Sequence, residues 1–366
     1  MTRSRLHELS SHGVSVWVDS LSRELLETGE LAHLVAEDAA VGVTSNPTIF
    51  QLALSTGTWY DGQLRAELER HESTKEVFIA LAVEDIRRAC DLLHPVWERT
   101  GGVDGYVSLE VDPELAYERE ATFAEARRLS ELVGRDNLLV KIPATVPGLG
   151  AIEDSIAAGR SINVTLIFSL ERHAAVADAY VRGVERLVAA GGDPSRVASV
   201  ASFFVSRVDT ETDRRLAELG REDLQGKLAV ANARLAYEQY RELFSGERWE
   251  RLAAAGARPQ RCLWASTSTK NPAYRDVLYV EELIGAETVN TMPLETIAAF
   301  KDHGVSRETL IEGVDEAHAL LGELARAGVD YDDVTATLEA EGVQKFADSF
   351  HSLLAGIDAK RAALVA

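Results

Sequence analysis

The sequence predicts an α/β fold in which parallel strands close into a single barrel. Short apolar runs, rich in β-branched residues and ended by turn or polar residues, recur along the 366 residues. Segments with apolar residues at helical spacing separate these runs, and Glu171–Ala190 is an example. This alternation indicates parallel pairing, because each return to the same end of a sheet needs a crossover connection.

Eight runs have the length and composition of strands. In chain order they are Val14–Asp19, Val41–Ser45, Tyr106–Val111, Leu138–Ile142, Ile162–Phe168, Val197–Val205, Cys262–Ser266 and Glu287–Met292. Their nearly continuous apolar character suits strands that are buried on both faces. Eight strand–helix units fit a closed (β/α)8 TIM barrel better than an open sheet.

The nucleotide-binding alternatives lack their signatures. A doubly wound fold would place GxGxxG after its first strand, whereas Val14–Asp19 leads into Ser20-Leu21-Ser22-Arg23. A GxxxxGK[ST] loop is also absent from the sequence. The barrel is therefore the expected fold.

Three connections are longer than a simple barrel requires. Thr48–Thr100 has room for two or three helices, and Ser206–Gly256 is also long and largely helical in pattern. The tail from Ser306 predicts two or three further helices that end in Val343–Leu364. Because no linker rich in Pro, Gly or Ser separates these additions, we expect residues 1–366 to form a single domain.

Composition narrows the possible partners. The formal net charge of −21 argues against nucleic acid or an anionic membrane as the main partner. The sequence has no apolar run long enough to span a membrane and no apolar signal core near its start, so we expect a cytoplasmic protein. Cys90 and Cys262 lie far apart in apolar surroundings without a metal-binding pattern, which predicts buried, reduced thiols.

One lysine lies in an unusual setting. Lys141 is flanked by Leu139, Val140 and Ile142 within the fourth run. The other six lysines, which lie in polar or helical contexts, are Lys75, Lys227, Lys270, Lys301, Lys345 and Lys360. Removal of an amine from water lowers its pKa, which makes the free amine available as a nucleophile. The alternative is a lysine at the barrel rim that pairs with a carboxylate for structure alone.

Two carboxylates accompany this lysine in the strand pattern. Glu110 follows Leu109 inside the third run, which is a poor place for an unpaired carboxylate. Asp19 ends the first run, although it could instead cap the next helix in competition with Ser20 or Ser22. Barrel enzymes place their active sites at the carboxyl ends of the strands. A lysine and two carboxylates there suit carbonyl chemistry, with a nucleophile and separate proton-transfer groups.

Neutral and cationic groups extend this set. Polar residues that need hydrogen-bonding partners within or beside the strands are Asn46, Asn163, Thr165 and Ser202. Sugar hydroxyls are suitable partners for them, although Asn46-Pro47 could be only a strand-to-helix turn. Arg207 ends the sixth run and Lys270 follows the seventh, where barrels often bind phosphate. Surface salt bridges are the alternative for both cations.

The motifs on successive strands resemble those of the transaldolase family. They are Trp-Val-Asp, Thr-Ser-Asn-Pro, Ser-Leu-Glu-Val, Val-Lys-Ile-Pro-Ala-Thr, Asn-Val-Thr-Leu-Ile-Phe-Ser and Ala-Ser-Phe-Phe-Val-Ser-Arg. Each is weak alone, but all occur in family order, and the resemblance extends from Val16 to the Glu-Gly-Val-Gln-Lys-Phe-Ala-Asp-Ser-Phe segment near the end.

The resemblance implies catalytic roles for four residues. Lys141 matches the Schiff-base lysine, and Asp19 matches the carboxylate that takes a proton from the C4 hydroxyl. Glu110 matches the acid/base that acts through a water held partly by Thr165. No cofactor and no metal is implied.

The resemblance also implies substrate-binding residues. Asn46, Asn163 and Ser202 match positions that hold hydroxyls of the dihydroxyacetone unit, and Arg207 matches a phosphate-binding arginine.

The seventh strand departs from the family pattern. The usual Ala-Ser-x-Arg-Asn is here Ala-Ser-Thr-Ser-Thr-Lys-Asn. Either Lys270 replaces the second phosphate-binding arginine after a two-residue insertion, or Ser268 takes that place. We favour Lys270, with Ser266 as a hydrogen-bonding neighbour, although lysine cannot form the bidentate fork of arginine.

The implied enzyme is a transferase of the pentose phosphate pathway. It would move dihydroxyacetone from sedoheptulose 7-phosphate to glyceraldehyde 3-phosphate, giving erythrose 4-phosphate and fructose 6-phosphate, and would act as a monomer or homodimer. The nearest alternative is a fructose-6-phosphate aldolase of the same superfamily. That group resembles this chain, but it carries glutamine and tyrosine at the positions of Glu110 and Phe204. Two further alternatives are a barrel that binds sugar phosphate without covalent chemistry and a structural barrel, although a structural barrel leaves the buried polar residues unexplained.

Overall fold

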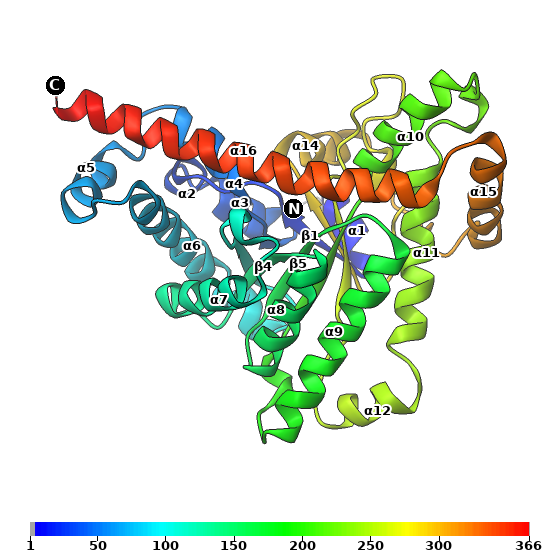
Figure 1. Cartoon of the computed structure of the whole chain (residues 1–366), viewed down its shortest axis with the longest axis horizontal. Helices are drawn as coiled ribbons and strands as arrows, with labels where there is room; N and C mark the ends of the chain where they lie inside the picture. Colours follow the sequence, from blue (N-terminus) through cyan, green and yellow to red (C-terminus); the bar gives the residue numbers. More distant parts are fainter. Residues whose placement is uncertain (1–3, 366) are drawn as a thin grey trace.

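The computed structural model describes residues 4–365 and contains a closed barrel of eight parallel strands (Figure 1). The strands are β1 (Val14–Val18), β2 (Ala40–Val43), β3 (Tyr106–Glu110), β4 (Leu138–Pro143), β5 (Ile162–Ile167), β6 (Ser199–Phe204), β7 (Arg261–Ala265) and β8 (Thr288–Met292). Each strand pairs with its neighbours in sequence, and β8 closes on β1. The predicted barrel and all of its strands are confirmed, with strand ends displaced by at most two residues.

Helices surround the barrel. They are α1 (Arg5–Ser11), α2 (Arg23–Glu27), α3 (Glu30–Glu37), α4 (Pro47–Ser55), α5 (Asp61–Arg70), α6 (Thr74–Arg99), α7 (Arg119–Val133), α8 (Val146–Ala157), α9 (Leu170–Ala189), α10 (Ser206–Glu218), α11 (Leu228–Leu243), α12 (Gly246–Ala254), α13 (Leu278–Glu281), α14 (Leu294–His303), α15 (Val314–Ala327) and α16 (Tyr331–Val365). The long connection after β2 holds α4, α5 and α6, and the helix expected at Glu171–Ala190 is α9. The tail holds two helices, within the predicted range.

The last helix is longer than the sequence pattern predicted. The expected segment began at Val343, whereas α16 is continuous from Tyr331 to Val365. Gly342 interrupts the helical pattern because glycine lowers helix propensity. In the structure, a Cβ at this position would lie 3.0 Å from the Leu166 side chain. Close packing against β5 at this position therefore accounts for a glycine inside the continuous helix.

Helix α16 lies across one end of the barrel (Figure 1). Its Glu339 pairs with Arg172 of α9, with 3.2 Å between the charged atoms. Its Ser349 forms a 2.8 Å hydrogen bond with Thr48 of α4. Because α4 follows β2 and α9 follows β5, these contacts join opposite sides of the barrel, at the end where the strands finish.

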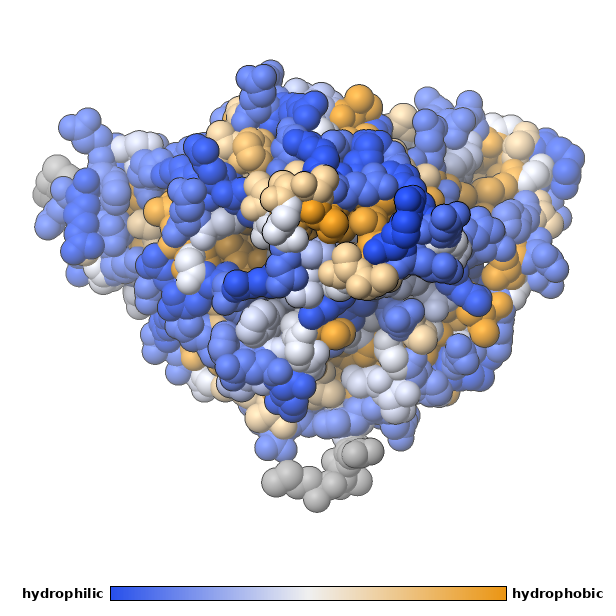
Figure 2. Space-filling model, turned by 90° about the horizontal axis from the view of Figure 1, so that it is seen from below, coloured by the Kyte–Doolittle hydropathy of each residue, from blue (hydrophilic) through white to orange (hydrophobic). Residues whose placement is uncertain are grey.

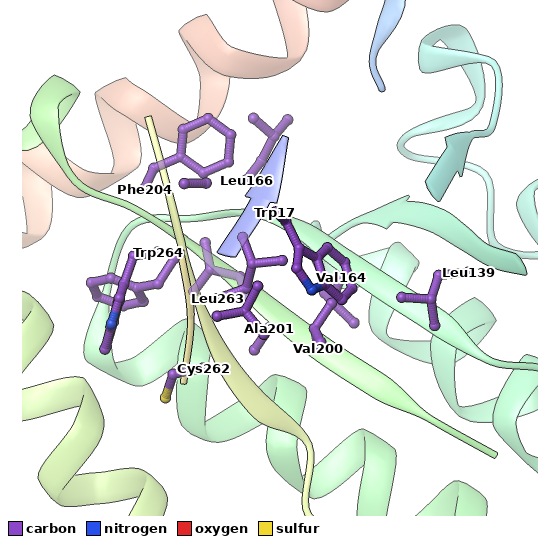
Figure 3. Close-up of a cluster of buried hydrophobic side chains, with 14 of the residues drawn as sticks. Trp17, Leu139, Val164, Leu166, Val200, Ala201, Phe204, Cys262, Leu263 and Trp264 are labelled. Atoms are coloured by element: carbon purple, nitrogen blue, oxygen red, sulfur yellow. The ribbon is translucent and has the colours of Figure 1, made fainter. Parts of the chain in front are cut away.

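Large side chains fill the barrel and its outer layer. Trp17 of β1 packs over Gly42 of β2, where a Cβ would lie 2.4 Å from the indole ring. Figure 3 shows Trp17 in a cluster with buried side chains of β5, β6 and β7. On β7, Cys262 and Trp264 lie on the opposite side of the strand from Leu263 (Figure 3). Because successive side chains of a strand point to opposite faces, one set faces the barrel interior and the other faces the surrounding helices.

Two further predictions concern the cysteine thiols and the absence of a membrane-spanning segment. Cys90 and Cys262 are both buried and free, as predicted. None of the helices in residues 4–365 is long and apolar enough to cross a membrane. From below the view of Figure 1, the surface consists mainly of hydrophilic residues with small hydrophobic areas between them (Figure 2).

The contact between Trp17 and Gly42 predicts a stability defect. Gly42→Ala should lower the free energy of unfolding by about 1–3 kcal/mol, because the added methyl group overpacks the barrel interior. Gly62→Ala on α5, where a Cβ meets nothing within 4 Å, should be neutral or stabilising. Urea denaturation of both variants tests this, and an equal effect at the two positions would contradict the packing argument.

Candidate active site

The strand register brings three predicted polar residues into one layer of the barrel. Glu110 of β3 pairs with Lys141 of β4, and Lys141 pairs with Asn163 of β5. Residues paired across neighbouring parallel strands point to the same side of the sheet. The three side chains therefore lie next to one another, near the end of the barrel that α16 covers.

Lys141 is almost completely buried, with 4% of its surface exposed. Its Nζ lies 3.4 Å from Glu110 Oε2 and donates a hydrogen bond to the Ser45 carbonyl oxygen at 3.3 Å. The ring of Phe346, from α16, lies 5.7 Å from Nζ. The amine is thus held beside one carboxylate and covered by an aromatic ring, where bulk water is largely excluded.

Glu110 is a buried carboxylate with few partners. Neither of its oxygens accepts a hydrogen bond from any residue that the structure describes, and only the ion pair with Lys141 is present. Burial raises the pKa of Glu110 to about 7, and the positive charge of Lys141 limits that increase. A carboxyl group with this pKa can both donate and accept a proton near neutral pH, as acid/base catalysis requires.

Asp19 does not cap the following helix. Ser22 caps α2, since its side chain accepts the hydrogen bond from Leu25 N. The Asp19 carboxylate instead accepts a 2.7 Å hydrogen bond from Thr44 Oγ1, which also lies 2.6 Å from Thr291 Oγ1. Burial raises the pKa of Asp19, while the charge of Lys141 and the Thr44 hydrogen bond act in the opposite direction.

Neutral side chains beside this group form a connected chain. Ser202 Oγ donates to Asn163 Oδ1 at 2.7 Å, and Asn163 Nδ2 donates to Ser108 Oγ at 3.0 Å. Thr165 Oγ1 is buried and has no hydrogen-bond partner within residues 4–365. Asn46 caps α4, because its Oδ1 accepts from Ile49 N at 3.0 Å. The turn interpretation of Asn46 is therefore correct for its oxygen, and its amide nitrogen donates no hydrogen bond within residues 4–365.

Arg207 lies one element later than predicted. The sixth strand ends at Phe204, and Arg207 is in the first turn of α10. The expectation that it ends the strand was wrong because Ser206 already begins a helix. Its guanidinium lies 5.2 Å from the ring of Phe204, which itself packs against Phe168 at 5.1 Å. Burial lowers the pKa of Arg207.

Lys270 and Ser268, the two candidates for the second phosphate-binding position, touch each other. Lys270 Nζ donates to Ser268 Oγ at 2.6 Å in the loop between β7 and α13. Ser266, which has a left-handed φ of 57°, forms a 2.9 Å hydrogen bond with Ser206 at the start of α10. The loop after β7 is thus joined to the helix that contains Arg207.

Surface salt bridges do not explain these two cations. In the described part of the chain, no carboxylate oxygen lies within 4.0 Å of the charged nitrogens of Arg207 or Lys270. Both cations are therefore left available for an anionic ligand.

Comparison with known proteins shows the family of the chain. The model of the Transaldolase/Fructose-6-phosphate aldolase family matches residues 16–357. The chain belongs to this family. A transaldolase of Parafrankia sp. (strain EAN1pec) is 56% identical over 95% of this chain and 96% of the relative. A transaldolase of Acidothermus cellulolyticus is 56% identical over 96% and 95%, and transaldolase 1 of Streptomyces avermitilis is 51% identical over 97% and 95%.

The structure adds site residues that the sequence reasoning missed. Ser108 lies two positions before Glu110 on β3, so strand alternation alone could have found it. Thr44 precedes Asn46 by two positions in the same polar turn, but only the fold shows that it contacts Asp19. Phe346 had no local signal, because its role depends on where α16 crosses the barrel.

The raised pKa of Glu110 predicts a pH-dependent contribution to stability. A pKa of about 7 in the folded protein, against an ordinary value of 4.5 for a glutamate side chain, means that this contribution is complete below about pH 4.5. It is lost as the pH rises through about 7. Glu110→Gln stays neutral, so its free energy of unfolding relative to the wild type should increase by about 1–3 kcal/mol between about pH 5 and about pH 8.

Urea denaturation at the two pH values measures this difference. Glu250→Gln, an exposed change on α12, is the matched control and should show no such trend. A constant difference between the wild type and Glu110→Gln would contradict the raised pKa.

Proposed function

We propose that this protein is a transaldolase that transfers a dihydroxyacetone unit through a Schiff base at Lys141. The donor is sedoheptulose 7-phosphate and the acceptor is glyceraldehyde 3-phosphate, both of them intermediates of a cytoplasmic pathway. The observation that supports the proposal most strongly is the buried Lys141 Nζ, 3.4 Å from a carboxylate whose pKa is about 7. The transaldolase names of relatives with 51–56% identity support it independently.

The first chemical step is imine formation. Transfer of a proton from Lys141 to Glu110 leaves a neutral amine, which attacks the C2 carbonyl of the donor. Protonated Glu110 then returns a proton to the departing hydroxyl group, so that water leaves and the iminium forms. Thr165, whose hydroxyl is buried beside β4, would hold the water that relays this proton.

Asp19 serves the carbon–carbon cleavage. Its carboxylate removes the proton of the C4 hydroxyl, the C3–C4 bond breaks, and the bonding electrons pass to the iminium to give an enamine. The aldose phosphate leaves, and the enamine then attacks the acceptor aldehyde. Thr44 is a positioning residue in this step, since its hydrogen bond fixes the carboxylate.

The remaining polar groups bind substrate. Asn163 and Ser202, already oriented by their mutual hydrogen bond, contact hydroxyls of the dihydroxyacetone unit together with the Asn46 amide nitrogen. Arg207 and Lys270 bind the phosphate, with Ser266 as a hydrogen-bonding neighbour.

A fructose-6-phosphate aldolase is the second candidate, because the family includes both activities. An aldolase releases free dihydroxyacetone and therefore needs water to reach and hydrolyse the imine. Phe204 offers no hydroxyl to such a water, and its ring is packed between Phe168 and Arg207. This apolar wall favours transfer over hydrolysis.

Borohydride trapping tests the covalent step. After incubation with fructose 6-phosphate and reduction, peptide mapping should find a three-carbon adduct on Lys141. Lys141→Met should remove the adduct, because no other lysine in residues 4–365 pairs with Glu110, and circular dichroism should show that the variant is folded. Wild-type protein that acquires no adduct on Lys141 would refute the proposed mechanism.

The ratio of transfer to release distinguishes the two candidates. With fructose 6-phosphate as donor, erythrose 4-phosphate should be converted to sedoheptulose 7-phosphate much faster than free dihydroxyacetone appears. Phe204→Tyr should raise the released share several-fold, because the new hydroxyl can hold a hydrolytic water near the imine. Phe203→Tyr, at the neighbouring position that faces His173 of α9, is the control. Predominant release by the wild type would favour the aldolase.

A further inference from the structure

One face of α16 lies against the mouth of the barrel. Gly342 packs against Leu166 of β5, and the ring of Phe346 covers the Lys141 amine. Ser349 forms a hydrogen bond with Thr48 of α4. These α16 residues are four and three positions apart, which is the spacing of one helical face. Residues on this face, and beside it, are therefore within reach of a substrate bound at Lys141.

Lys345 lies on this side of the helix, three residues after Gly342 and next to Phe346. Arg207 and Lys270, the two predicted phosphate-binding residues, are close enough for their charges to act on it. The positive charge of Arg207 lowers the pKa of Lys345, followed in effect by partial burial and by the charge of Lys270. Burial lowers the pKa of Arg207, while the negative charges of Asp19 and of Glu341, one helical turn before Lys345, act in the opposite direction. Two cations from two other elements, Arg207 of α10 and Lys270 of the loop after β7, thus act on the ammonium group of Lys345.

The carboxylates near this group of cations lie beyond ion-pair distance of Lys345 and therefore compensate its charge only in part. Within the described residues, no carboxylate oxygen lies within the 4.0 Å ion-pair distance of Lys345 Nζ. The chain has 59 acidic residues against 38 Lys and Arg, so carboxylates are plentiful elsewhere on its surface. Like charges raise one another's energy, and a bound dianion offsets the part of that repulsion that Asp19 and Glu341 leave.

We propose that Lys345 is a third phosphate-binding cation of the active site, so that α16 supplies part of the substrate site. The inference rests on the proposed function, in that the anion is the phosphate of a sugar phosphate. A third cation also explains how the site can have Lys270 after the seventh strand, where the family usually has an arginine. Lys270 is a point charge without the bidentate fork of arginine, and a second ammonium on the other side of the phosphate compensates for the weaker contact.

This assignment makes Lys345 a determinant of specificity. A substrate without phosphate gains nothing from a third cation, whereas a phosphorylated one does. Because the contact is remote from the reacting carbons, its loss should weaken binding more than it slows the chemical steps.

Steady-state kinetics with paired acceptors test the inference. Lys345→Gln should raise KM for glyceraldehyde 3-phosphate roughly tenfold or more, as expected for a lost hydrogen bond to a charged group. The same variant should leave KM for unphosphorylated glyceraldehyde within about twofold, and kcat at saturation should change little. Lys345→Arg, which keeps the charge, should restore most of the affinity. An unchanged KM for the phosphorylated acceptor, or an equal rise for both acceptors, would overturn the assignment.

Lys360→Gln is the matched control on the same helix. Lys360 Nζ lies 3.3 Å from Asp61 Oδ1, on α5, so it is engaged in an ion pair away from Lys141. Its substitution should leave both KM values unchanged. A rise equal to that of Lys345→Gln would show a general effect of surface charge and would also overturn the assignment.

Calorimetry with inorganic phosphate separates this inference from the proposed function. If the wild type forms no adduct and transfers no dihydroxyacetone, the proposed function fails, but phosphate binding can still be measured. Lys345→Gln should then raise the Kd for inorganic phosphate about tenfold, and Lys360→Gln should not. Equal Kd values for the wild type and Lys345→Gln would refute the role of Lys345.

Discussion

The burial of Lys141 beside Glu110 is the constraint on which the rest of the site depends. Moving an ammonium and a carboxylate out of water is costly, and a single 3.4 Å contact with no further hydrogen bond to the carboxylate offsets only part of that cost. The remaining penalty appears as the raised pKa of Glu110. A pair that was better satisfied would stabilise the fold more, but its carboxylate would be a poorer proton donor at neutral pH.

The barrel produces this arrangement through register. Parallel pairing places Glu110, Lys141 and Asn163 at the same height on three neighbouring strands, so one layer of the interior becomes polar. Below it, the interior is filled by large side chains such as Trp17, for which Gly42 provides space. The packed lower layer keeps the polar layer near the barrel mouth, and α16 closes the site from above with Phe346.

Much of this could be predicted from the sequence, for a physical reason. Strands buried on both faces have continuous apolar runs, so polar residues inside them, such as Glu110 and Lys141, were conspicuous. Arg207 was assigned to a strand end because the apolar pattern continues to Val205, although the helix begins at Ser206. The contributions of Phe346 and Lys345 to the site could not be predicted from the residues next to them in the sequence. They depend on a helix that crosses the barrel far from the strands in sequence, and Gly342 weakened the pattern of that helix.

Cations that repel one another need a rigid support, and α10 provides it. Arg207 begins this helix, and Asp213 on the same helix accepts a 2.6 Å hydrogen bond from Tyr274 in the loop that contains Lys270. On the other side, Arg215 of α10 pairs with Asp333 of α16 at 2.6 Å. The two other elements that present cations, the loop after β7 and α16, are therefore both attached to α10. The fold therefore holds these positive charges in place without a bound anion, and under the proposed assignment an incoming phosphate needs no rearrangement of them.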